Sequence, residues 1–136
     1  MKQTQQTPPV EDVIAVAEFR AALRQFLRRS ERVARESGLT PQRHLLLMMI
    51  KGAPDGTEQS TVTELSNRLQ LAQSTVTELV RRAEEAGLVE REQSQRDARV
   101  AYLRLTGEGE RRLMLSFTEL ATERAQLREA FAHLDS

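Results

Sequence analysis

The stretch TVTELSNRLQLAQSTVTELVRR, Thr61 to Arg82, decides the fold, because it predicts two short helices joined by a tight turn. Thr61 and Glu64 have the spacing of a capping box, in which each side chain bonds the backbone N–H of the other residue at the start of a helix. Residues Gln70 to Ala72 then form the turn. The pattern therefore predicts a helix–turn–helix.

The second helix of this stretch has two unlike faces. At about 100° per residue, its buried stripe consists of Val76, Leu79, Val80 and Ala83, and its outer face carries Ser74, Thr77, Glu78 and Arg81. Small hydroxyls and an arginine suit the edges of base pairs. Any helical hairpin with a polar outer face would show the same pattern, so this stretch alone leaves both interpretations open.

The composition is typical of a single helix-rich globular domain, with 39% hydrophobic and 29% charged residues. No apolar run approaches the roughly 20 residues of a membrane span, and the first residues lack the apolar core of a signal peptide. We therefore expect a cytoplasmic protein with no membrane partner. The chain has no Cys and only two His, His44 and His133, so we expect no disulfide, no metal site and no cofactor.

No enzyme signature is present in the sequence. We find no phosphate-binding loop, no Ser–His–Asp grouping, no metal-ligand spacing and no carboxylate pair in a perturbing context. We therefore expect no enzyme activity. The net charge of zero gives no global signal for nucleic acid either.

Long helical patterns flank the central stretch. The first runs from about Val10 to Ser37 and is closed by Gly38. Its remaining surface carries many arginines, which fit a solvated face, a membrane-surface helix or one half of a dimer interface. Interspersed acidic residues weaken the membrane interpretation. A helix of this length exceeds what a small core can cover, so we expect part of it to pack against another chain.

A second helix begins at Thr40-Pro41, with the hydroxyl as N-cap and proline in the first turn. Its run LLLMMI, Leu45 to Ile50, is apolar all round and predicts a helix buried in the middle of the domain. Gly52 closes this helix. We expect an exposed loop from there to Ser60.

Two strands follow the helix–turn–helix. Leu88 to Arg91 and Val100 to Leu105 read as a hairpin, and the polar loop from Glu92 to Ala98 is too long for a tight turn. Helix, turn, helix and a hairpin with a basic tip is the layout of a winged helix.

The C-terminal region begins at Thr106 as N-cap, and Gly107 and Gly109 predict close packing in its first turn. Apolar residues then repeat at spacings of four and three, with Arg124 interrupting, at Leu113, Phe117, Leu120, Leu127, Phe131 and Leu134. This is a coiled-coil-like seam that favours association through the chain's two ends. No Gly or Pro marks a break, so the sequence leaves open whether the region forms one helix or two.

These segments resemble the MarR family (multiple antibiotic resistance regulators), dimeric winged-helix transcription regulators of bacteria and archaea. The resemblance covers roughly Leu39 to Leu113, and its most specific parts are STVTELV, GLVER, the wing motif Asp97-Ala98-Arg99, and LT-x-x-G at Leu105 to Gly109. It implies a mainly α (α+β) fold over 1–136. The winged helix-turn-helix lobe would span 39–105, with the recognition helix at about 73–86 and the wing at about 88–105. Dimerisation helices would lie at 8–37 and 106–136.

The resemblance also implies a DNA-binding site on double-stranded DNA. Residues expected in the major groove are Gln73, Ser74, Thr75, Thr77 and Arg81. Arg99 is expected in the minor groove, held by a salt bridge from Asp97, with Arg96 as a second contact. Glu78 departs from this picture, because phosphates would repel it. It either accepts a hydrogen bond from a cytosine amino group or neutralises Arg81 or Arg82, and the second interpretation is the favoured one.

The implied function is a homodimeric regulator, a repressor, that binds a pseudo-palindromic operator and is released by a small organic effector. In the family the effector lies between the dimerisation helices and the DNA-binding lobe, which makes Arg20, Arg24, His44 and Met48 the candidate ligand residues. The alternative is a winged-helix protein-interaction module without specific DNA binding. The zero net charge and Glu78 favour this alternative, and the wing arginines oppose it.

Overall fold

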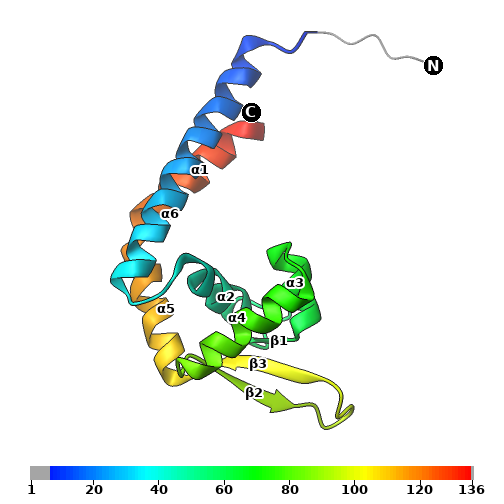
Figure 1. Ribbon diagram of the computed structural model, residues 1–136. Helices are drawn as coiled ribbons and strands as arrows, with labels where there is room; N and C mark the ends of the chain where they lie inside the picture. The colour runs from blue at the N-terminus through cyan, green and yellow to red at the C-terminus, as the bar shows by residue number, and fades with distance from the viewer. Residues whose placement is uncertain (1–6, 136) are drawn as a thin grey trace, which may run out of the picture.

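The computed structural model describes residues 7–135, which form helices and one small antiparallel sheet. In chain order these elements are α1 (Val10–Glu36), α2 (Pro41–Lys51), β1 (Gln59–Ser60), α3 (Val62–Leu69), α4 (Gln73–Glu85), β2 (Val89–Gln93), β3 (Ala101–Leu105), α5 (Gly107–Glu119), α6 (Ala121–Ala132) and the 3-10 turn η1 (His133–Asp135). Figure 1 shows two parts. The winged-helix lobe, residues 39–105, lies at one end, and α1 and α6 lie side by side as a helical arm that extends away from it.

The boundaries of the first two helices follow the predicted capping residues. The hydroxyl of Thr40 accepts a hydrogen bond from the backbone N–H of Arg43 at 3.2 Å. Gly38 has a φ of 76°, the left-handed conformation that suits glycine just after a helix. The apolar run of α2 is not buried all round, however, because the side chain of Leu45 is 43% exposed. Only one stripe of this helix faces the core.

The helix–turn–helix forms as predicted. The backbone N–H of Glu64 donates to the Thr61 hydroxyl at 3.2 Å, and the backbone N–H of Thr61 donates to the Glu64 carboxylate at 2.8 Å, which completes the capping box. Gln70 adopts the left-handed conformation with φ 57° and ends α3. After this turn, α4 packs against both α2 and α3.

The sheet has three strands, in the order β1-β3-β2. Gln59 lies opposite Arg104, and Ser60 lies opposite Leu103. The predicted hairpin forms as β2 and β3. The prediction of an exposed loop up to Ser60 is wrong at its end, because Gln59 and Ser60 form a third strand beside β3. This strand could not be predicted, because two residues are too few to show the alternation of apolar and polar residues that is typical of a strand. Its buried residue, Ser60, is also polar.

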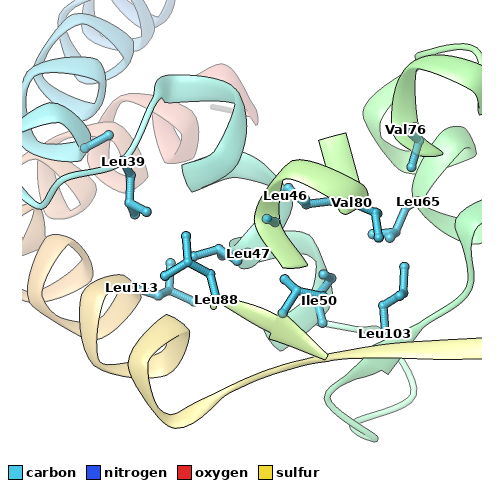
Figure 2. Packing of buried hydrophobic residues seen from close by; sticks show 13 residues of the cluster. Leu39, Leu46, Leu47, Ile50, Leu65, Val76, Val80, Leu88, Leu103 and Leu113 are labelled. Carbon is cyan, nitrogen blue, oxygen red and sulfur yellow. The ribbon is translucent and has the colours of Figure 1, made fainter. Parts of the chain in front are cut away.

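The core lies inside the winged-helix lobe. Figure 2 shows apolar side chains from α2, α3, α4, β3, α5 and the link between α4 and β2 converging there; they include Leu46, Leu47, Ile50, Leu65, Val76, Val80, Leu88, Leu103 and Leu113. A Cβ on Gly109 would lie 2.1 Å from the carbonyl oxygen of Leu88, so α5 approaches the backbone before β2 as closely as a glycine allows. The predicted close packing holds at Gly109 but not at Gly107, where a Cβ would meet nothing within 4 Å.

The C-terminal region forms two helices, which settles a point that the sequence left open. Leu120, with φ −97° and ψ 11°, separates α5 from α6 and is buried. The Arg124 guanidinium lies 3.6 Å from the centroid of the Phe117 ring and also donates to the Phe117 carbonyl, so one side chain spans the break. The predicted apolar seam is divided between α5 and α6 at Leu120, and its residues Phe117 and Phe131 are exposed in the protomer.

Candidate nucleic-acid interface

The helix α4 presents a polar face because its apolar face is fixed in the core. Val76, Val80 and Ala83 are fully buried against the lobe. The opposite face carries Ser74, Thr75 and Thr77, which are exposed and whose side chains hydrogen-bond to no other residue that the structure describes. Their donors and acceptors are available to a ligand. Ala72 occupies the N-cap position without a side-chain hydrogen bond, so no side chain covers the start of this helix.

The C-terminal half of α4 carries an ion-pair network. The Glu78 carboxylate accepts hydrogen bonds from Nε and Nη2 of Arg81 at 3.0 and 2.6 Å and from Nε of Arg82 at 3.0 Å. Arg81 also donates to Glu85. The hydrogen bonds from Arg81 and Arg82 lower the pKa of Glu78 to about 2, so this carboxylate is charged at neutral pH. The favoured interpretation of Glu78, as the residue that neutralises these arginines, agrees with these contacts.

The wing holds an arginine in an outward position. The Arg99 side chain is 90% exposed, and its Nε and Nη2 donate to the two carboxylate oxygens of Asp97 at 3.1 and 3.2 Å. The backbone N–H of Arg99 donates to the same carboxylate at 3.0 Å. These hydrogen bonds lower the pKa of Asp97, which keeps it charged. The expected ion pair is therefore present and orients a fully exposed cation.

The tip of the wing is an ordered turn. The Ser94 hydroxyl accepts hydrogen bonds from the backbone N–H groups of Arg96 and Asp97 at 3.2 and 3.3 Å. The backbone N–H of Ser94 donates to the Val100 carbonyl at 2.9 Å. The Arg96 side chain is exposed and has no ionic partner among the residues that the structure describes. The tip thus presents two cations on a fixed backbone.

The start of α4 and the wing lie on one continuous surface. Gln73 donates to the Thr63 hydroxyl of α3 at 3.3 Å. Thr63 in turn lines a groove between α3 and the wing, together with Arg91 and Arg99. Arg91 donates to Glu84 of α4 at 3.0 Å, which fixes the wing against that helix. The predicted DNA-contacting residues of α4 and of the wing are therefore carried by elements that contact each other.

Residues 37–100 match the model of the MarR family, and this segment holds the helix–turn–helix and most of the wing. This segment belongs to the MarR family.

Solved structures share the MarR-family fold of this chain. The M. tuberculosis transcriptional regulator MOSR in complex with DNA is 28% identical, with a TM-score of 0.60 over 79% of this chain and 75% of that chain. A mutant of MarR from E. coli complexed with operator DNA is 18% identical, with a TM-score of 0.65 over 89% and 85%. AbsC from Streptomyces coelicolor is 22% identical, with a TM-score of 0.62 over 96% and 84%. No curated protein sequence matches the chain closely enough to count as a relative.

The candidate effector residues lie in two places. Arg20 and Arg24 line a groove along α1 that includes neither His44 nor Met48. His44 is 3% exposed, its Nε2 has no hydrogen-bond partner among the described residues, and burial lowers its pKa. Met48 is half-buried against the core. The structure of one protomer does not bring the two pairs into one pocket.

Two features of this interface were missed from the sequence. Glu85 is a second partner of Arg81, and Arg91 connects the wing to Glu84. The first could have been found from the spacing of four residues between Arg81 and Glu85, which places both on one helix face. The second joins a helix to a strand and carries no local signal. Within residues 7–135, no His, Asp and Glu side chains gather into a potential metal site, and no helix is long and apolar enough to span a bilayer.

Proposed function

We propose that this protein is a sequence-specific DNA-binding transcription regulator, with α4 in the major groove and the wing arginine in the minor groove. The observation that carries the proposal is Arg99, which is 90% exposed and held by Asp97. A narrow minor groove concentrates negative potential and attracts an arginine placed in this way. Because the guanidinium is already oriented, little side-chain entropy would be lost on binding.

The outer face of α4 supports the major-groove part of the proposal. Gln73, Ser74, Thr75 and Thr77 supply amide and hydroxyl groups that can donate to or accept from base edges. The N-terminus of α4 lacks a side-chain cap, so its first N–H groups can donate to a phosphate. The MOSR and MarR structures with DNA are relatives in fold for which such a complex has been solved.

The exposed apolar side chains of the helical arm support the proposal of a homodimer. Large apolar side chains remain exposed on α1, α5 and α6; they are Val10, Val13, Ile14, Val16, Leu27, Met114, Leu115, Phe117 and Phe131. A second copy of the chain would cover them with the same surface. Two copies of α4 would then read a pseudo-palindromic operator, with half-sites about 34–36 Å apart along the duplex.

We further propose that the regulator is a repressor released by a small organic effector near the junction of arm and lobe. The C-terminal end of α1 contacts α2, so a ligand that moves α1 would change the position of the lobe. A difference in affinity of about 1–3 kcal/mol between the two states would suffice for regulation. Arg20, Arg24, His44 and Met48 are the candidate residues. Arg20 and Arg24 would contact the same ligand as His44 and Met48 only if the second protomer completed the site.

A second candidate function is a winged-helix module that binds protein rather than DNA. One observation favours it: Arg81 and Arg82 are both paired with acids on their own helix. The net charge of zero points the same way.

Fluorescence anisotropy with promoter DNA from upstream of the protein's own gene distinguishes the two functions. For a DNA-binding protein the logarithm of the affinity falls linearly and steeply with the logarithm of the salt concentration, because phosphate contacts release counterions. Weak binding with a flat salt dependence would favour the protein-interaction module. An Arg81→Ala variant should reduce discrimination at one position in each half-site.

A further inference from the structure

We infer that Glu78 determines the base preference of α4, because Glu78 and Arg81 form a single unit that is complementary to a G·C base pair. This inference rests on the proposed function, since it assigns one base pair of each half-site to one pair of side chains. It also gives Glu78 a role in sequence specificity, although the negative charge of Glu78 is repelled by the DNA phosphates.

The geometry makes the two side chains one unit. Arg81 binds Glu78 through two parallel hydrogen bonds, from Nε to Oε2 at 3.0 Å and from Nη2 to Oε1 at 2.6 Å. Such a two-pronged contact fixes the plane of the guanidinium relative to the carboxylate. Arg82 donates to Oε1 from the other side at 3.0 Å. The guanidinium of Arg81 is further held by Glu85.

The unit keeps hydrogen-bonding capacity on its exposed side. Oε2 of Glu78 accepts only one of these bonds, so it retains a lone pair. Arg81 retains N–H donors beyond the three contacts to its two acidic partners. The side chains of Glu78 and Arg81 are 46% and 54% exposed, so these groups face solvent. The helix surface therefore presents adjacent donors and an acceptor.

This order of groups matches a G·C pair. In the major groove guanine offers two neighbouring acceptors, N7 and O6, and its cytosine offers the N4 amino donor beside them. Arg81 can donate to guanine while Glu78 accepts from cytosine. An A·T pair places its donor between two acceptors and adds a methyl group. There the carboxylate would face an acceptor or the methyl group and would lose hydration without a partner.

The same network limits binding to other sequences. Two acids, Glu78 and Glu85, balance the two arginines of this surface, Arg81 and Arg82, so it carries no net charge. It therefore adds little to the attraction by phosphates that drives non-specific binding. Because all four side chains are about half exposed, the ion pairs are individually weak. Loss of Glu78 would free Arg82 for phosphates and would leave Arg81 paired with Glu85.

The test compares the parent protein with Glu78→Gln and Glu85→Gln. Each variant removes one negative charge from the same helix surface, and only the first removes the two-pronged partner of Arg81. Both sites are exposed, and circular dichroism and thermal melting check that each variant folds like the parent. Each protein selects duplexes from randomised double-stranded DNA. Affinities are then measured on the parent's selected duplex, on single base-pair changes of it and on unrelated DNA, over a salt series.

We expect the parent to require a G·C pair at one position in each half-site. Glu78→Gln should reduce that preference by roughly tenfold, the discrimination typical of a good two-pronged base contact. It should also bind unrelated DNA more tightly, with a salt slope steeper by about one, because Arg82 is freed and Arg81 keeps Glu85. Glu85→Gln should keep the base preference.

Equal base preferences in the parent and in Glu78→Gln would overturn the inference. Equal loss of base preference in Glu78→Gln and Glu85→Gln would overturn it as well, because such a loss would reflect the removed charge alone. A parent that selects no sequence at all would instead contradict the proposed function. The two failures are therefore distinguishable in one experiment.

Discussion

The winged-helix lobe and the helical arm place their apolar residues in opposite ways. In the lobe, apolar side chains from every helix point inward, and Leu46, Leu65 and Leu103 are fully buried. In the arm, α1 buries only Val33 and Ala34, both near the lobe, and α6 buries none of its residues. The lobe has a complete core of its own. The arm has only part of a hydrophobic core, and a second copy of the chain would supply the surface that completes it.

Internal contacts within the arm are few and specific. Phe19 and Phe131 meet edge to face with ring centroids 5.8 Å apart. Arg29 donates to Glu123 at 3.4 Å. These contacts align α1 with α6 but leave the outward apolar face uncovered. The lobe therefore has its core within one chain, whereas the arm has an apolar face that the proposed second copy would cover.

The largest expected effect is on the stability of the lobe. Gly109→Ala would place a methyl group 2.1 Å from the Leu88 carbonyl oxygen, which forces the backbone apart. We expect the free energy of unfolding to fall by about 1–3 kcal/mol or more, as overpacking does. Urea denaturation measures this change. Gly107→Ala is the matched control, because a Cβ there meets nothing within 4 Å. Equal stability of both variants would show that α5 is not tightly packed on the lobe.

The next effect separates the arm from the lobe. Ile14→Glu should dissociate the dimer and leave the lobe folded, because Ile14 is 54% exposed in the protomer. Burial of an isoleucine is worth about 1.5–3 kcal/mol, so the dimer dissociation constant should rise by more than about tenfold. Analytical ultracentrifugation measures it, with Ile14→Leu as the apolar control. An unchanged sedimentation coefficient for Ile14→Glu would place the interface elsewhere.

The smallest effect concerns pH and comes from the lobe's buried histidine. Burial lowers the pKa of His44 below its ordinary value of 6.5. The unfolded chain therefore takes up a proton at a higher pH than the folded protein, and stability is lost as the pH falls below about 6.5. Replacement by His44→Leu should flatten the decline of the unfolding free energy between about pH 7 and 5. The measurement is urea unfolding across that range. An identical decline in both proteins would rule out His44 as its source.

The sequence predicted those parts of the fold that local chemistry decides. The capping box at Thr61, the proline after Thr40 and the stripe on α4 each depend on residues within one or two helical turns. The ion pair between Asp97 and Arg99 spans two residues and was expected from the family resemblance. The winged-helix order followed from these local elements.

The features that the sequence did not predict depend on distant partners. Ser60 enters the sheet by pairing with Leu103, which lies far from it in the sequence. Leu120 ends a helix without Gly or Pro, and the contacts of Arg124 with Phe117 span that break. The separation of Arg20 from His44 likewise depends on how α1 leaves the lobe. Such features follow from tertiary packing and not from any local pattern.

The most direct test of DNA binding by this protein is a salt series with Arg99→Ala on promoter DNA and on an unrelated duplex. The matched control is Arg111→Ala, which removes an equally charged, exposed arginine paired with Glu108 on α5. We predict that Arg99→Ala weakens binding to both duplexes by about tenfold, as loss of a charged hydrogen bond does, and lowers the salt slope by about one. Arg111→Ala should bind like the parent. Parent-like affinity and slope for Arg99→Ala would contradict the proposed interface.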